Sequence, residues 1–182
     1  MRTIRKKRGF KLAPKSPNLG FRWKRALHWL HFATTTTNTA GTVYLTLFEF
    51  ESTATVDAVQ YIHGAALAGN VIVGIYGPIP TEETCLGAPV VVQSASTAVS
   101  GSANQPSIVT FTPTRIGPGR YYAAVEFDDG ANTFMRHSNQ TQVTGWTQTY
   151  ARGGGYGALT DPCPAVTDAS TSIPGVYVRF QP

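Results

Sequence analysis

Residues 43–50 read Val-Tyr-Leu-Thr-Leu-Phe-Glu-Phe, an aromatic and β-branched run with the alternation expected of a half-buried β-strand. Similar runs follow it, separated by clusters of Gly, Pro, Asn and Ser that favour turns. No window of ten residues in this part of the chain carries a helical period. The sequence therefore predicts an all-β fold, an antiparallel β-sandwich or jelly roll. The further strands that we expect are 55–62, 71–76, 108–112, 121–127 and 176–180, with weaker ones at 90–93 and 133–136.

The chain before residue 43 differs in character. Trp23, Leu27 and Leu30 are spaced as i, i+4 and i+7, which predicts a short amphipathic helix over residues 21–32. A Thr-rich stretch without periodicity follows it and predicts a linker. The expected organisation is a basic N-terminal arm with a short helix (1–33), a linker (34–42) and one β-sandwich domain (43–182).

The length of 182 residues, with 42% hydrophobic and 14% charged residues, fits one folded domain with a short extension. Charge is divided unevenly along it. Residues 1–32 hold ten Lys and Arg and no acidic residue, whereas the rest holds five Arg and all ten Asp and Glu. The arm thus carries +10 and the body −5, which predicts that the arm contacts a negatively charged partner.

Aromatic residues are interleaved with the charges of the arm, and this favours a groove on another protein over a purely electrostatic contact. Contact with nucleic acid stays open as an alternative. The candidate docking residues are Arg5, Lys6, Lys7, Arg8, Phe21, Trp23, Leu27, Trp29 and Leu30.

Targeting and redox signals are sparse. The apolar stretch 26–33 contains two histidines, so it does not fit a secretory signal, and no run approaches the roughly 20 apolar residues of a transmembrane helix. We therefore expect a soluble protein without a membrane partner. Cys85 and Cys163 lack metal-ligand spacing. We expect two free thiols, with a disulfide as the alternative.

Sequence motifs of catalysis are missing. The chain contains no nucleophile elbow, zinc-protease motif or phosphate-binding loop. Asp128-Asp129-Gly130 is typical of a tight turn, and His28 and His31 are without a third metal ligand. The sequence predicts no enzyme activity, no metal and no cofactor.

Residues 133–164 form a long segment that is poor in charge and contains aromatic and amide side chains. Such rings stack on sugar faces and the amides match hydroxyl groups, so a glycan site is one interpretation. Packing against neighbouring subunits is the other. The candidate glycan-binding residues are Trp146, Tyr150, Asn139 and Gln148.

The body resembles the β-sandwich (jelly-roll) module of tailed-bacteriophage virion proteins, such as minor tail proteins, fibres and head fibres. The resemblance covers about residues 43–127. It rests on Val43–Phe48, Ala54–Asp57, Gly69, Val73–Tyr76, Leu86–Pro89, Thr112-Pro113 and Gly117–Val125.

This resemblance implies a structural protein located in the virion, associated with a tail or fibre and docked to other virion proteins through residues 1–32. It further implies a homo-oligomer, for which we expect a trimer, with a cell-surface polysaccharide as a candidate partner of the loops. The alternative is a single-jelly-roll capsid or head-decoration protein whose basic arm contacts nucleic acid or the shell.

Overall fold

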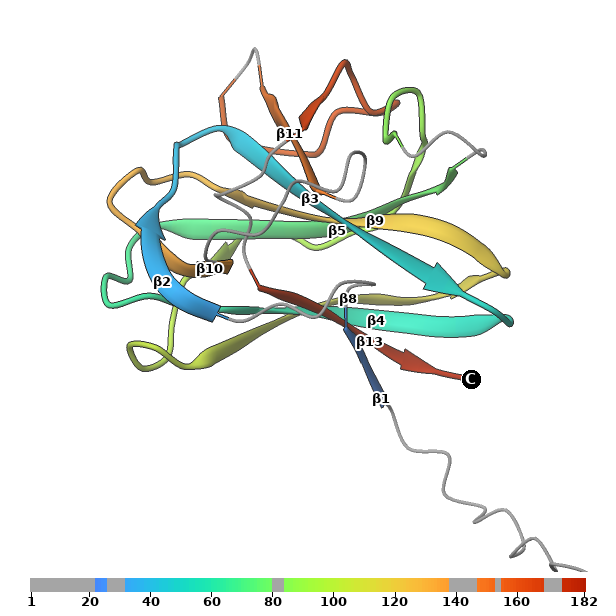
Figure 1. Cartoon of the computed structure of the whole chain (residues 1–182), viewed down its shortest axis with the longest axis horizontal. Helices are drawn as coiled ribbons and strands as arrows, with labels where there is room; N and C mark the ends of the chain where they lie inside the picture. Colours follow the sequence, from blue (N-terminus) through green and yellow to red (C-terminus); the bar gives the residue numbers. More distant parts are fainter. Residues whose placement is uncertain (1–21, 26–31, 80–83, 138–146, 153–154, 169–174) are drawn as a thin grey trace, which may run out of the picture.

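The structure is a computed structural model that describes residues 22–25, 32–79, 84–137, 147–152, 155–168 and 175–182 (Figure 1). All regular elements in these ranges are β-strands, and every strand pairing between them is antiparallel. No helix long and apolar enough to cross a membrane occurs in the described ranges. The predicted all-β class is confirmed.

Two larger sheets and one two-stranded ribbon make up the fold. The four-stranded sheet has the order β1 (Arg22–Arg25), β13 (Val176–Gln181), β4 (Ala54–Ile62), β8 (Pro106–Ile116). The seven-stranded sheet has the order β12 (Thr167–Asp168), β11 (Thr147–Ala151), β3 (Thr42–Phe50), β9 (Gly119–Phe127), β5 (Asn70–Ile79), β6 (Val90–Gln93), with β7 (Thr97–Ala98) also paired to β5. The ribbon consists of β2 (Phe32–Thr37) and β10 (Thr133–His137).

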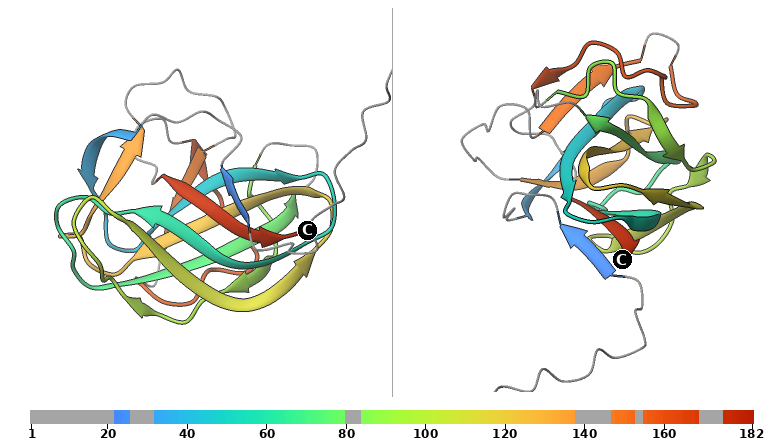
Figure 2. Two further views of the ribbon diagram at one scale, coloured as in Figure 1. Left: turned by 90° about the horizontal axis from the view of Figure 1, so that it is seen from below. Right: turned by 90° about the vertical axis from the view of Figure 1, so that its right-hand side faces the viewer.

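The two larger sheets face each other, with the four-stranded sheet below the seven-stranded sheet in Figure 1; Figure 2 shows the same layers from two other sides. The core between them follows the alternation of the strands. On β9, for example, Tyr121, Ala123, Val125 and Phe127 belong to the core cluster that also includes Val56, Val59 and Tyr61 of β4, which makes the fold a β-sandwich. Burial of these alternating positions is the main stabilising contribution.

The seven-stranded sheet is also buried on its other face. Tyr122 and Ala124 of β9 contact a second cluster with Val43, Leu45 and Ile72. Because its central strands are covered on both sides, β3 and β9 are almost continuously apolar rather than strictly alternating.

The strands expected from the sequence are confirmed. The six main predictions correspond to β3, β4, β5, β8, β9 and β13, and the two weaker ones to β6 and β10. Strand β11 and the two-residue strands β7 and β12 were not predicted.

The N-terminal prediction is wrong where the structure can be compared with it. Residues 22–25, expected in a helix, form β1, in which Trp23 pairs with Arg179 of β13. As a strand, these four residues form hydrogen bonds with backbone N–H and C=O groups on the outer edge of β13. The spacing of apolar residues along the chain does not show that this edge is available. Residues 26–31 lie outside the described ranges.

The predicted linker is also partly wrong, since Phe32–Thr37 is strand β2, paired with β10. Its consecutive threonines are β-branched and suit a strand once a partner strand is available. Strand β1 thus belongs to the four-stranded sheet of the sandwich.

Candidate functional site

The outer face of the seven-stranded sheet is where the chain departs most from a simple sandwich. Strand β11 extends the sheet beside β3, and the orange-red segments after it lie over this face, together with the green segment between β5 and β6 (Figure 1). Residues from these segments complete the second cluster, namely Cys85, Ala88, Tyr150, Leu159 and Cys163. We define this covered region as the capped face.

A glycine allows the cover to approach the sheet. A Cβ atom on Gly74 of β5 would lie 2.5 Å from a methyl group of Leu159 and 2.8 Å from the Val92 carbonyl oxygen. Gly74 therefore leaves the room that Leu159 fills, and a larger residue there would push the cover outward.

Two tyrosine hydroxyl groups meet beneath the cover. The Tyr76 and Tyr150 hydroxyl oxygens are 2.7 Å apart, and Tyr76 donates to the Thr160 carbonyl oxygen at 2.8 Å. Burial raises the pKa of both tyrosines above the ordinary value. Both stay protonated at neutral pH, so the pair acts as a hydrogen-bonding connection between sheet and cover.

Gln148 performs a similar task two residues before Tyr150. Its Oε1 accepts a hydrogen bond from the Cys85 backbone N–H at 2.9 Å. Because β11 pairs with β3, Gln148 lies opposite Leu45 and Tyr150 lies opposite Val43, and both side chains point into the capped face.

The prediction of a glycan-binding surface is therefore wrong for Tyr150 and Gln148. Tyr150 is 4% exposed and Gln148 is 2% exposed, so neither presents a surface on which a sugar can stack. The physical reason is the cover formed by residues 155–166, which the composition of the segment did not indicate. The other two candidates, Asn139 and Trp146, lie outside the described residues.

Of the docking candidates, the structure describes the backbone of Trp23 in β1. Arg5, Lys6, Lys7, Arg8, Phe21, Leu27, Trp29 and Leu30 lie outside the described residues. The prediction that these residues dock to a partner is therefore not tested by the structure.

Glu126 is a residue that the sequence reasoning missed. It is the penultimate residue of β9, on the same side as Tyr122 and Ala124, and it is fully buried. Burial raises its pKa to about 7, while the Arg152 guanidinium and the Gly157 backbone N–H act in the opposite direction. The nearest oxygen and nitrogen atoms of Glu126 and Arg152 are 3.8 Å apart. A single acidic residue inside the run Tyr-Tyr-Ala-Ala-Val-Glu-Phe was the available signal.

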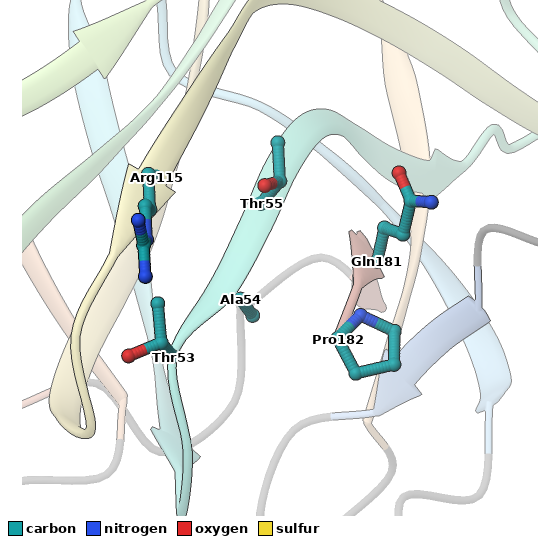
Figure 3. Close-up of a pocket in the computed structure, with 6 residues that line it drawn as sticks. All are labelled: Thr53, Ala54, Thr55, Arg115, Gln181 and Pro182. Atoms are coloured by element: carbon teal, nitrogen blue, oxygen red, sulfur yellow. The ribbon is translucent and has the colours of Figure 1, made fainter. Parts of the chain in front are cut away.

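A shallow pocket of about 300 Å³ opens at the other side of the molecule, where β4 begins and β8 and β13 end (Figure 3). Its lining combines one cation, two hydroxyl groups and one side-chain amide with the apolar side chains of an alanine and a proline. Such a lining can contact an anion but supplies no acid–base pair. The lining residues are Thr53, Ala54, Thr55, Arg115, Gln181 and Pro182.

Within the described ranges, no three His, Cys, Asp or Glu side chains are grouped closely enough to hold a metal ion. Asp128, expected in a turn, accepts hydrogen bonds from the backbone N–H and side-chain Nδ2 of Asn70, both at 2.6 Å. Asp129 accepts one from the Ala131 backbone N–H at 2.7 Å, as in an Asx turn.

Comparison with known proteins gives little beyond the fold. No protein-family model and no curated protein matches the chain. Among solved structures, a clostridial cysteine protease, Cwp84, after propeptide cleavage matches 93% of this chain with a TM-score of 0.53 and 13% sequence identity. This chain spans 43% of the length of that structure. At such low identity the match supports a shared fold and carries no activity across.

Proposed function

We propose that this chain is a structural protein of a bacteriophage virion, a jelly-roll type of β-sandwich anchored to the particle by its basic N-terminal arm. The observation that carries the proposal is the separation of charge and fold. Residues 1–21 contain seven basic and no acidic residues, and they directly precede β1, the edge strand of the four-stranded sheet. The tail- or fibre-associated position follows from the sequence resemblance.

The position of β1 defines how the arm joins the body. Since β1 pairs with β13 from Arg22 to Arg25, the arm is attached to the sheet through a ladder of backbone hydrogen bonds. A force that pulls on residues 1–21 would therefore act directly on the four-stranded sheet. This supports an anchoring role for residues 1–21, with Arg and Lys pairing to carboxylates on a neighbouring virion protein.

The body supplies the displayed surface. A sandwich whose larger sheet is covered on both faces leaves its strand edges and loops for contacts with other subunits, which fits a homo-oligomer. We propose a trimer. The burial of Tyr150 and Gln148 removes them from any contact with polysaccharide.

A deletion tests the anchoring role. A variant lacking residues 1–21 keeps β1 and every other described strand, so we expect a folded, β-rich protein that fails to enter particles assembled from the neighbouring virion proteins. A matched variant of full length replaces the seven basic residues of this segment with Gln. Incorporation of both variants at the wild-type level would overturn the proposal.

A second measurement separates protein docking from nucleic-acid contact. Binding of the intact chain to a short mixed-sequence DNA duplex is measured over a range of salt concentrations. A steep logarithmic salt dependence that disappears in the Gln variant would favour the capsid or head-decoration alternative. Sedimentation analysis of the intact chain determines whether it is trimeric.

A further inference from the structure

The two cysteines of this chain lie together although they are far apart in sequence. Cys85 lies between β5 and β6 in the sequence, and Cys163 lies between β11 and β12. Both side chains nevertheless belong to the capped face, where they are 0% and 1% exposed. The Cys163 thiol lies near enough to the Cys85 thiol to contribute, after burial, to the raised pKa of Cys85. Both are free thiols in the structure.

The backbone around the pair is held in register. The Gly87 N–H donates to the Cys163 carbonyl oxygen at 2.8 Å, and the Cys163 N–H donates to the Ala88 carbonyl oxygen at 2.8 Å. The Cys85 N–H is held in turn by Gln148 Oε1 at 2.9 Å. These hydrogen bonds hold the two backbone segments that carry Cys85 and Cys163 beside each other, which is the arrangement that a disulfide between them requires.

We propose that Cys85 and Cys163 are a disulfide-forming pair, in which oxidation links residues 84–89 covalently to residues 158–163 across the capped face. This proposal is independent of the proposed virion function. It assigns to the two cysteines a cross-link that joins the two segments covering the seven-stranded sheet, which the sequence alone left as an alternative.

The reaction is a thiol–disulfide exchange with a small-molecule disulfide such as oxidised glutathione. One cysteine loses its proton and its thiolate attacks the oxidant, which forms a mixed disulfide and releases one glutathione thiolate. The second cysteine, also deprotonated, attacks the protein sulfur of that mixed disulfide and releases the second glutathione thiolate. The two protons pass to the two glutathione thiolates, so the pair loses two electrons and the oxidant gains them.

Access decides when the bond forms. Burial and the neighbouring thiol raise the pKa of Cys85, so its thiolate is scarce in the closed structure. The cover is thin, however, because Leu86 beside it is 55% exposed and residues 160–162 are exposed. We therefore expect fast oxidation during folding or local opening and slow oxidation of the closed protein.

Refolding tests the proposal. The reduced, denatured chain is refolded in a mixture of reduced and oxidised glutathione, and in a parallel sample with reductant alone. We expect the first product to be a monomeric chain lighter by two hydrogen atoms, with a non-reduced peptide that joins Cys85 to Cys163. We also expect it to melt roughly 5 to 10 °C higher than the reduced product.

Controls use Cys85→Ala, Cys163→Ala and the double variant, whose melting temperatures should not respond to the oxidant. Two titratable thiols in a folded product from the glutathione mixture would overturn the proposal, as would glutathione attached to both cysteines. If the chain does not refold, the folded protein as isolated is incubated with oxidised glutathione under native conditions. Persistence of both free thiols after mild urea has opened the cover would then overturn it.

Discussion

The Arg179 guanidinium donates two hydrogen bonds to the Asp57 carboxylate, from Nε to Oδ1 at 2.7 Å and from Nη2 to Oδ2 at 2.8 Å. Asp57 is the residue that the registers of both neighbouring strands skip, since β13 and β8 each pair with Val56 and then with Ala58. The bulge that breaks the ladder is thus fastened by a bidentate ion pair, which joins β4 to β13 beside the N-terminal strand β1.

Loss of this ion pair should weaken the four-stranded sheet. Asp57→Asn keeps the shape of the side chain but removes its charge, and we expect the free energy of unfolding to fall by about 1–2 kcal/mol because the pair is mostly buried. Urea denaturation followed by circular dichroism measures the change. The matched control is Glu49→Gln, which removes the exposed contact of 3.9 Å to Arg120 and should change stability by less than about 0.5 kcal/mol. An equal effect of both substitutions would contradict the interpretation.

Glu126 should make the stability of the protein depend on pH. Its pKa rises from 4.5 in the unfolded chain to about 7 in the folded protein. Folding therefore favours the protonated form, so its contribution is fully present below pH 4.5, declines through the interval up to about 7 and levels off above it. We expect Glu126→Gln to exceed the wild type in stability by about 2 kcal/mol at pH 8 and to match it near pH 4.5.

Denaturation curves at several pH values check this difference between variant and wild type. His63, whose pKa is lowered by burial, acts in the opposite sense and loses stability as the pH falls below its ordinary value. Since His63 is present in both proteins, its effect cancels in the difference. A constant difference across the pH range would show that ionisation of Glu126 is not responsible.

Phe134 should fasten the β2–β10 ribbon to the core. Its ring is fully buried, stacks on Phe127 with centroids 5.9 Å apart and meets the edge of Tyr44 at 5.1 Å. We expect Phe134→Ala to cost about 3–5 kcal/mol because it leaves a cavity between ribbon and sandwich. Ile108→Ala, at a side chain that is 49% exposed, serves as the control and should cost less than about 1 kcal/mol. A similar loss for both would place the ribbon outside the cooperative core.

Tyr76 should hold the cover on the seven-stranded sheet. Tyr76→Phe removes the hydroxyl that bonds to Tyr150 and Thr160, and we expect a loss of about 1–2 kcal/mol together with faster amide exchange in residues 158–163. Tyr156→Phe is the control, since its hydroxyl contacts Ser96 at the exposed surface. Adding Tyr150→Phe to Tyr76→Phe should cost less than the sum of the two single effects. Full additivity would show that the two hydroxyl groups do not act together.

The sequence by itself predicted most strands of the sandwich, because runs such as 43–50 and 121–127 are rich in aromatic and β-branched residues that favour strands locally. It also located the division of charge between arm and body, which depends only on composition along the chain. Both properties are written in consecutive residues and need no knowledge of the partner segment.

The tertiary structure alone decided the elements whose stability comes from distant partners. Residues 22–25 form a strand because the edge of β13 offers backbone groups for pairing. The spacing of Trp23, Leu27 and Leu30 predicts a helix because it contains no information about that edge. Tyr150, Gln148 and Glu126 are buried because residues 155–166 fold back over the seven-stranded sheet. Polar side chains in a charge-poor segment are equally compatible with solvent or with such a cover, and only the packing between segments far apart in the chain selects one of the two.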